Sequence, residues 1–169
     1  MMHVREALRR APLIDDLPGL HLLAVGSGWD LLRVTAEPGF LALAMLRTTG
    51  QSIGPVLYDR PSARLYFAIP SGTTDSWQDL PVRLLSHGSW LVAPSPYRAH
   101  EYFGGWCELP DDDTLTDPEK LRHALHKYAA TTATPEESPS WKPSNAPASM
   151  PTSAASPPDS PQPSALQRS

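Results

Sequence analysis

The C-terminal part of the chain has a composition that cannot build a hydrophobic core. Residues 131–169 consist mostly of Pro, Ser, Ala and Thr, and Trp141 and Met150 are almost the only large apolar side chains among them. Such a segment buries too little apolar surface to offset roughly 1–2 kcal/mol of backbone entropy per ordered residue. We therefore expect one folded domain in residues 1–130 and a disordered tail in residues 131–169.

The charge balance argues against broad, non-specific binding to nucleic acid. The formal net charge is −4, and acidic residues also slightly outnumber basic residues within residues 1–130. Non-specific binding needs a basic surface, although a local basic groove remains compatible with this balance. The single cysteine excludes an intrachain disulfide and any cysteine-based metal motif.

The chain shows no targeting or membrane signal. No stretch approaches the ~20 consecutive apolar residues of a transmembrane helix. The N-terminal residues are basic but lack the apolar core of a signal peptide. We expect a cytoplasmic protein without a membrane partner.

Apolar runs and turn residues predict the order of secondary structure. Residues 20–25 and 29–35 read as strands, and the second is nearly continuously apolar, as in a strand covered on both faces. Residues 37–50 carry Pro in the first turn and Gly at the end, which predicts a well-buried helix. Two strands flanking a turn, residues 55–59 and 64–69, predict a hairpin.

The second half of the domain gives three further signals. Residues 82–85 and 89–93 predict a second strand pair around Gly88, and residues 102–109 predict a last strand. Thr116 stands three residues before Glu119, the spacing of a capping box at the start of a helix. Together these elements predict an α+β fold with a mixed or antiparallel sheet and helices packed on it.

Three segments carry a family resemblance. Residues 29–39, 64–70 and 88–96 resemble, in order and spacing, the N-terminal domain of bifunctional DNA primase/polymerases, the prim-pol branch of the archaeo-eukaryotic primase superfamily. The stretch from Gly88 to Pro96 is similar to the family's glycine-aromatic-valine-valine-alanine-proline-proline motif. The resemblance covers residues 20–130 and implies a prim-pol-like fold.

The resemblance also implies a loss of the family's chemistry, which is two-metal nucleotidyl transfer by clustered carboxylates. Arg33 and Thr35 stand where the family has an Asp-x-Asp pair, Arg64 stands at its histidine, and Arg83 stands at its third carboxylate. Arginine cannot ligate a cation. We therefore expect no catalytic residues, no metal and no cofactor.

The resulting hypothesis is a catalytically inactive domain that acts by binding in a replication-linked or regulatory role. Its partner would be nucleic acid, a nucleotide or a protein. Arg33, Arg64 and Arg83 are the candidate phosphate ligands, because the planar guanidinium group matches phosphate oxygens. The alternative is that each arginine caps a strand end or pairs with a nearby acid.

Four of the five tryptophans offer stacking surfaces for bases, namely Trp29, Trp77, Trp90 and Trp106. Trp77 lies in a loop and is the candidate for an exposed contact with nucleic acid, whereas Trp90 lies in a strand and is expected to pack in the core.

Two other function classes stay open. One is an active DNA primase/polymerase that holds Mg²⁺ with Asp30, Asp59 or Asp79, which requires at least two of these carboxylates to face one cleft. The other is a protein-interaction module that does not bind nucleic acid.

The acidic run 111–113 would attract a cation or form a polar loop. His123 and His126, at i,i+3 spacing, would supply half of a metal site or a solvated helix face.

Overall fold

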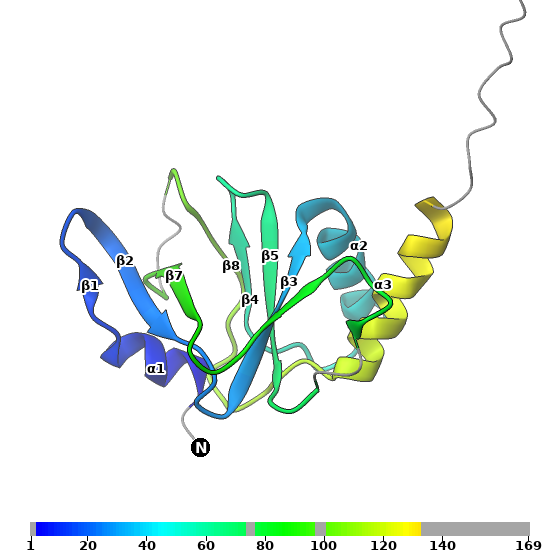
Figure 1. The fold of residues 1–169 in the computed structure, drawn as a ribbon, viewed down its shortest axis with the longest axis horizontal. Helices are drawn as coiled ribbons and strands as arrows, with labels where there is room; N and C mark the ends of the chain where they lie inside the picture. The colour runs from blue at the N-terminus through cyan, green and yellow to red at the C-terminus, as the bar shows by residue number, and fades with distance from the viewer. Residues whose placement is uncertain (1–2, 74–76, 97–100, 133–169) are drawn as a thin grey trace, which may run out of the picture. The chain divides into compact units, whose positions relative to one another are not determined.

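The computed structural model describes residues 3–73, 77–96 and 101–132, within a unit that spans Met1–Pro135. This unit contains two antiparallel sheets and three helices (Figure 1), so the predicted α+β fold is confirmed. The tail predicted to be disordered lies outside the described residues, apart from the end of the last helix.

Along the chain the elements are α1 (Val4–Arg10), β1 (Leu13–Ile14), β2 (Leu17–Ala24), β3 (Trp29–Thr35), α2 (Ala36–Thr48), β4 (Val56–Asp59), β5 (Arg64–Pro70), β6 (Arg83–Leu85), β7 (Trp90–Pro94), β8 (Gly104–Glu108) and α3 (Pro118–Thr132). A five-stranded sheet has the order β6-β3-β5-β4-β8, and a three-stranded sheet has the order β1-β2-β7. All paired strands are antiparallel.

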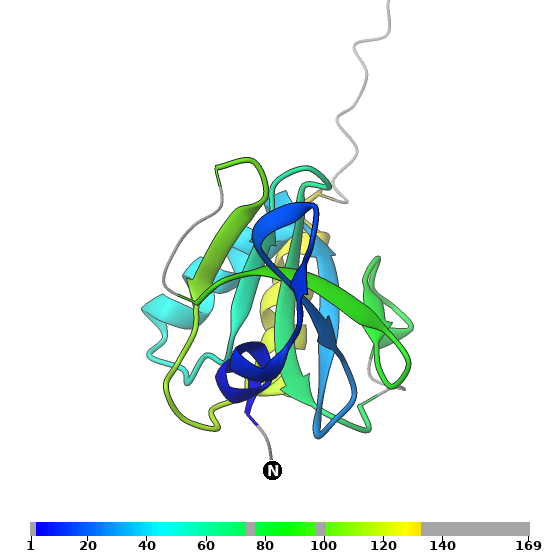
Figure 2. The same cartoon turned by 90° about the vertical axis from the view of Figure 1, so that its left-hand side faces the viewer.

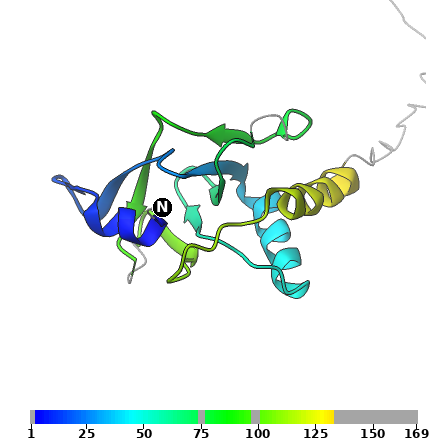
Figure 3. The same ribbon diagram turned by 90° about the horizontal axis from the view of Figure 1, so that it is seen from below.

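The five-stranded sheet is covered on both faces. Helices α2 and α3 pack on one face, while α1 and the three-stranded sheet lie on the other (Figure 3). Alternate residues of a strand point to opposite faces, so Leu32 and Phe67 enter the helix-side core and Leu31 and Ala68 enter the other core. The prediction that residues 29–35 form a strand buried on both faces is confirmed.

The predicted hairpin and central helix are also present. Strands β4 and β5 pair across the turn that follows Asp59. Helix α2 ends just before Gly50, whose φ of 65° is the left-handed conformation expected after a helix end. Only one side of α2 is buried, however, since Phe40 and Leu41 are exposed.

The predicted pairing of residues 82–85 with residues 89–93 is wrong. Strand β6 pairs with β3 in the large sheet, whereas β7 pairs with β2 in the small sheet. Figure 2 looks onto the small sheet, with α3 behind the large one. The apolar pattern of each segment predicts a strand but does not specify its partner, because strand pairing depends on contacts distant in sequence.

The predicted cap of α3 is shifted by one residue. The Oδ1 atom of Asp117 accepts hydrogen bonds from the backbone N–H groups of Glu119 and Lys120, at 2.9 and 3.1 Å. Thr116 is instead fully buried, and its Oγ1 accepts the backbone N–H of Gly54 at 3.0 Å. The threonine therefore joins α3 to the start of β4 rather than capping the helix.

Candidate functional site

The three arginines predicted to bind phosphate lie on one face of the five-stranded sheet. Arg33 of β3 is directly opposite Arg83 of β6 on one side and Tyr66 of β5 on the other. Arg64 lies two residues before Tyr66 on the same strand. Because opposed residues of antiparallel strands point to the same face, all three arginines share the face that α1 and the small sheet partly cover. We call this group the arginine face.

The arginine face has no counter-ion among the described residues. None of its three guanidinium groups makes a hydrogen bond or an ion pair with any residue that the structure describes. Arg83 is exposed, and Arg33 and Arg64 are half-buried. Directly opposed residues have Cβ atoms roughly 4.5–5.5 Å apart, and like charges at that separation destabilise a sheet. An anion bound between the guanidinium groups would relieve this repulsion.

Asp59 is the acidic residue opposite Arg64, but its carboxylate is already engaged. It accepts the Ser62 hydroxyl at 2.6 Å and the Ser62 backbone N–H at 3.3 Å, within the β4–β5 turn. One carboxylate beside three arginines leaves the arginine face positively charged. Among the described residues none of the three arginines pairs with an acid, whereas Arg64 and Arg83 do stand at strand ends, as the first residues of β5 and β6.

Tyr66 belongs to the same site and was not singled out from the sequence. Its side chain is 9% exposed, and burial is the main reason that its pKa is raised. The charge of Asp59 raises this pKa further, while Ser62, Arg33 and Arg64 lower it. The phenol therefore stays protonated at neutral pH and can donate a hydrogen bond to an anion. The sequence did contain a signal for Tyr66: it lies two residues after Arg64 in a predicted strand, and residues at that spacing point to the same face.

The carboxylates required by the active-enzyme alternative do not meet. Asp30 is aligned with Ile69 and Asp59 with Arg64, which are five positions apart along β5. At roughly 3.4 Å per residue this separation is about 17 Å. Asp30 is buried and accepts the Ser71 hydroxyl and the Gly72 N–H, both at 3.3 Å.

Asp79, the third of these carboxylates, lies beside α3 and not on the arginine face. Its Oδ2 atom is 2.7 Å from Nη2 of Arg122 and 2.8 Å from Nε2 of His126. No group of three or more His, Cys, Asp or Glu side chains in the described part of the chain is arranged to hold a metal ion.

The two tryptophan predictions are both wrong. Trp77 is only 4% exposed, packs in the helix-side core, and donates its indole N–H to Thr73 Oγ1 at 3.3 Å. It is therefore not exposed to stack on a base. Trp90 is 60% exposed, because it lies on the side of β7 that the rest of the described domain leaves uncovered.

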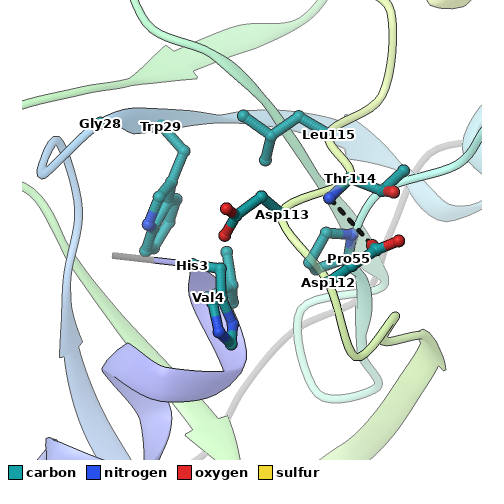
Figure 4. Close-up of a pocket in the computed structure, with 9 residues that line it drawn as sticks. All are labelled: His3, Val4, Gly28, Trp29, Pro55, Asp112, Asp113, Thr114 and Leu115. Carbon is teal, nitrogen blue, oxygen red and sulfur yellow. Dashed lines mark hydrogen bonds between the residues drawn. The ribbon is translucent and has the colours of Figure 1, made fainter. Parts of the chain in front are cut away.

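Among the described residues, the carboxylates of the acidic run are not part of a group arranged to hold a metal ion. Asp111 pairs with Arg5 at 2.9 Å, and Asp112 accepts the backbone N–H of Thr114 at 3.0 Å. The side-chain hydrogen bond of Thr114, followed by this backbone N–H, lowers the pKa of Asp112. Asp112 and Asp113 both line the small pocket drawn in Figure 4. The volume of that pocket is about 20 Å³, room for about one water molecule and not for a substrate.

We predict a pH response at Asp79. The hydrogen bond from Arg122 is the main reason that the pKa of Asp79 lies below its ordinary value. A carboxylate with a depressed pKa stabilises the fold above its unfolded-state pKa, and this contribution is lost as pH falls through the folded-state pKa. Replacing Arg122 by Gln should therefore move the Asp79 titration to higher pH in a carboxyl NMR experiment. Arg47→Gln serves as the control, and an equal shift in both variants would contradict the assignment.

In comparison with known proteins, no family model, no curated protein and no solved structure matches the chain. Among the described residues, no helix is both long and apolar enough to span a membrane.

Proposed function

We propose that this domain binds the phosphate groups of nucleic acid through Arg33, Arg64 and Arg83, and that it is a prim-pol-like domain that has lost its metal chemistry. The observation that carries the proposal is the arginine face itself. Three guanidinium groups share one sheet face and have no hydrogen-bond or ion-pair partner among the described residues.

The chemistry of the face suits phosphate and not a divalent cation. Guanidinium groups present several N–H donors in a planar fork that matches two phosphate oxygens. Tyr66 adds a neutral hydroxyl donor beside Arg33 and Arg64. A magnesium ion at the same place would meet three positive charges and, among the described residues, one carboxylate, which is already hydrogen-bonded to Ser62.

The net charge of the chain fits a local site. A chain with a net charge of −4 repels polyanions except where positive charge is concentrated. Binding should therefore depend on these three residues and weaken steeply with salt, since contacts to single-stranded phosphates release about 0.7 counterions each.

The test is fluorescence anisotropy of a labelled oligo(dT) with the full-length protein, between about 50 and 200 mM salt. Each Arg→Gln substitution at position 33, 64 or 83 should weaken binding and lower the slope of log affinity against log salt by about 0.7. Arg47→Gln is the matched control. Arg47 lies outside the arginine face, and its Nη2 atom is 2.6 Å from Oε1 of Glu108.

Three results would contradict the proposal. The first is an absence of salt-dependent binding by the wild-type protein. The second is a loss of binding in Arg47→Gln as large as the loss in the variants of the arginine face. Primer synthesis by the pure protein with a template, nucleotides and Mg²⁺ or Mn²⁺ would reject the claim that the metal chemistry is lost.

A further inference from the structure

A second feature lies at the same edge of the large sheet, on its helix side. A pocket of about 210 Å³ opens between the first turn of α2, the second half of α3 and the segment that leads into β6. Its walls are mainly apolar, with Val34, Pro38, Pro81 and Val82 among the lining residues. We call it the edge pocket, since β6 is the outer strand of the sheet.

The size of the edge pocket fits a planar ring system. A cavity of about 150 Å³ in another protein holds benzene, so about 210 Å³ accommodates a larger heterocycle. The lining also includes the aromatic side chain of Tyr128. Bases stack on aromatic side chains with a gain of about 1–3 kcal/mol each.

One carboxylate in the edge pocket determines which heterocycles can form hydrogen bonds there. Glu37 lines the pocket, and its Oε1 accepts the Tyr128 hydroxyl at 3.3 Å. No cationic side chain in the described part of the chain pairs with Glu37. A carboxylate only accepts hydrogen bonds and has about four acceptor positions. Glu37 can therefore accept two further N–H groups from a ligand.

Guanine is the base whose edge matches this carboxylate. It offers two adjacent donors, N1–H and the N2 amino group, which suit two carboxylate oxygens. Adenine and cytosine each place an acceptor nitrogen beside their amino donor, and thymine and uracil flank one donor with two carbonyl oxygens. Both arrangements would bring an acceptor against the carboxylate, which costs the hydrogen bond and adds repulsion.

The edge pocket and the arginine face are the two sides of the same strand pair. Val34 follows Arg33 on β3, and Val82 directly precedes Arg83 of β6. Neighbouring residues of a strand point to opposite faces. A ligand that passes around the short edge strand would therefore have its base on the helix side and its phosphates on the arginine side.

We infer that the edge pocket takes the base of a guanine nucleotide, free or within a single strand, with Glu37 accepting its N1–H and N2 amino groups and the arginine face holding its phosphates. This inference rests on the proposed phosphate-binding function. It adds a base preference, which phosphate contacts alone do not give.

Calorimetric titration of the full-length protein with GTP, ATP, CTP and UTP tests the free nucleotide, and oligo(dG)-containing against oligo(dT) strands test the polymer. GTP should bind about 10- to 100-fold more tightly than ATP, the discrimination of one good bidentate contact. Glu37→Gln keeps the shape but replaces one acceptor by a donor, so it should remove the guanine preference without weakening oligo(dT) binding. Glu119→Gln, at an exposed carboxylate of α3 that does not line the edge pocket, should change neither.

The outcomes separate the two proposals. Equal affinity for all four nucleotides, or a guanine preference that survives in Glu37→Gln, overturns the base assignment. If the arginine variants still weaken oligo(dT) binding, phosphate binding stands without it. If GTP binds with a preference but independently of Arg33 and Arg83, the link between the pocket and the arginine face is wrong.

Discussion

Replacing Phe67 by alanine should lower the free energy of unfolding by about 3–5 kcal/mol. Phe67 lies on β5 at the centre of the large sheet, is fully buried, and is aligned with Leu32 and Val56 on its two neighbouring strands. Truncation would lose the transfer energy of the ring and leave a cavity that neighbouring strands cannot close. Urea unfolding followed by circular dichroism should show a lower midpoint with an unchanged slope.

Phe40 provides the matched control for this substitution. It carries the same side chain on α2 but is 41% exposed. Its ring makes an edge contact with the ring of Tyr58, and the two ring centroids are 5.0 Å apart. Phe40→Ala should cost only about 1 kcal/mol. A similar loss for both variants would mean that Phe67 is not in the core of the domain.

Replacing Gly26 by alanine should cost about 2–5 kcal/mol, the sum of two effects. Gly26 has a φ of 99°, where a side chain costs about 1–2 kcal/mol. A Cβ atom there would also lie 2.4 Å from the backbone Cα of His87, an overlap that adds about 1–3 kcal/mol. This contact holds the turn before β3 against the crossing from β6 to β7, so the variant should unfold at a clearly lower denaturant concentration.

Gly88→Ala separates the two effects. Gly88 has a similar φ of 86°, but a Cβ atom there would meet nothing within 4 Å. This variant should cost only the backbone term of about 1–2 kcal/mol. Equal losses at Gly26 and Gly88 would contradict the close approach of the two turns.

The sequence predicted the local elements well and their long-range pairing less well. Strand β3, helix α2 and the β4–β5 hairpin follow from apolar runs and turn residues within short windows. The separate partners of β6 and β7 do not, because both segments are short and apolar and the choice of sheet depends on β3 and β2, far away in the chain. The cap of α3 moved from Thr116 to Asp117 because a tertiary contact with Gly54 takes the threonine hydroxyl.

For the candidate site, too, the sequence predicted some features, whereas others follow only from the structure. The resemblance to prim-pol domains singled out Arg33, Arg64 and Arg83, but only the strand register shows that they share a face. Burial of the tryptophans was not predictable from element type. Trp77 is drawn into the core from a loop, while Trp90 stands on a strand of the small sheet and remains exposed.

The most direct measurement of the central claim is an NMR titration of the arginine side-chain Nε–H signals with oligo(dT). The account predicts that the signals of Arg33, Arg64 and Arg83 shift together along one saturation curve, while those of Arg47 and Arg122, which are already paired with Glu108 and Asp79, stay in place. Equal shifts at all five arginines, or no shift at the three on the arginine face, would contradict it.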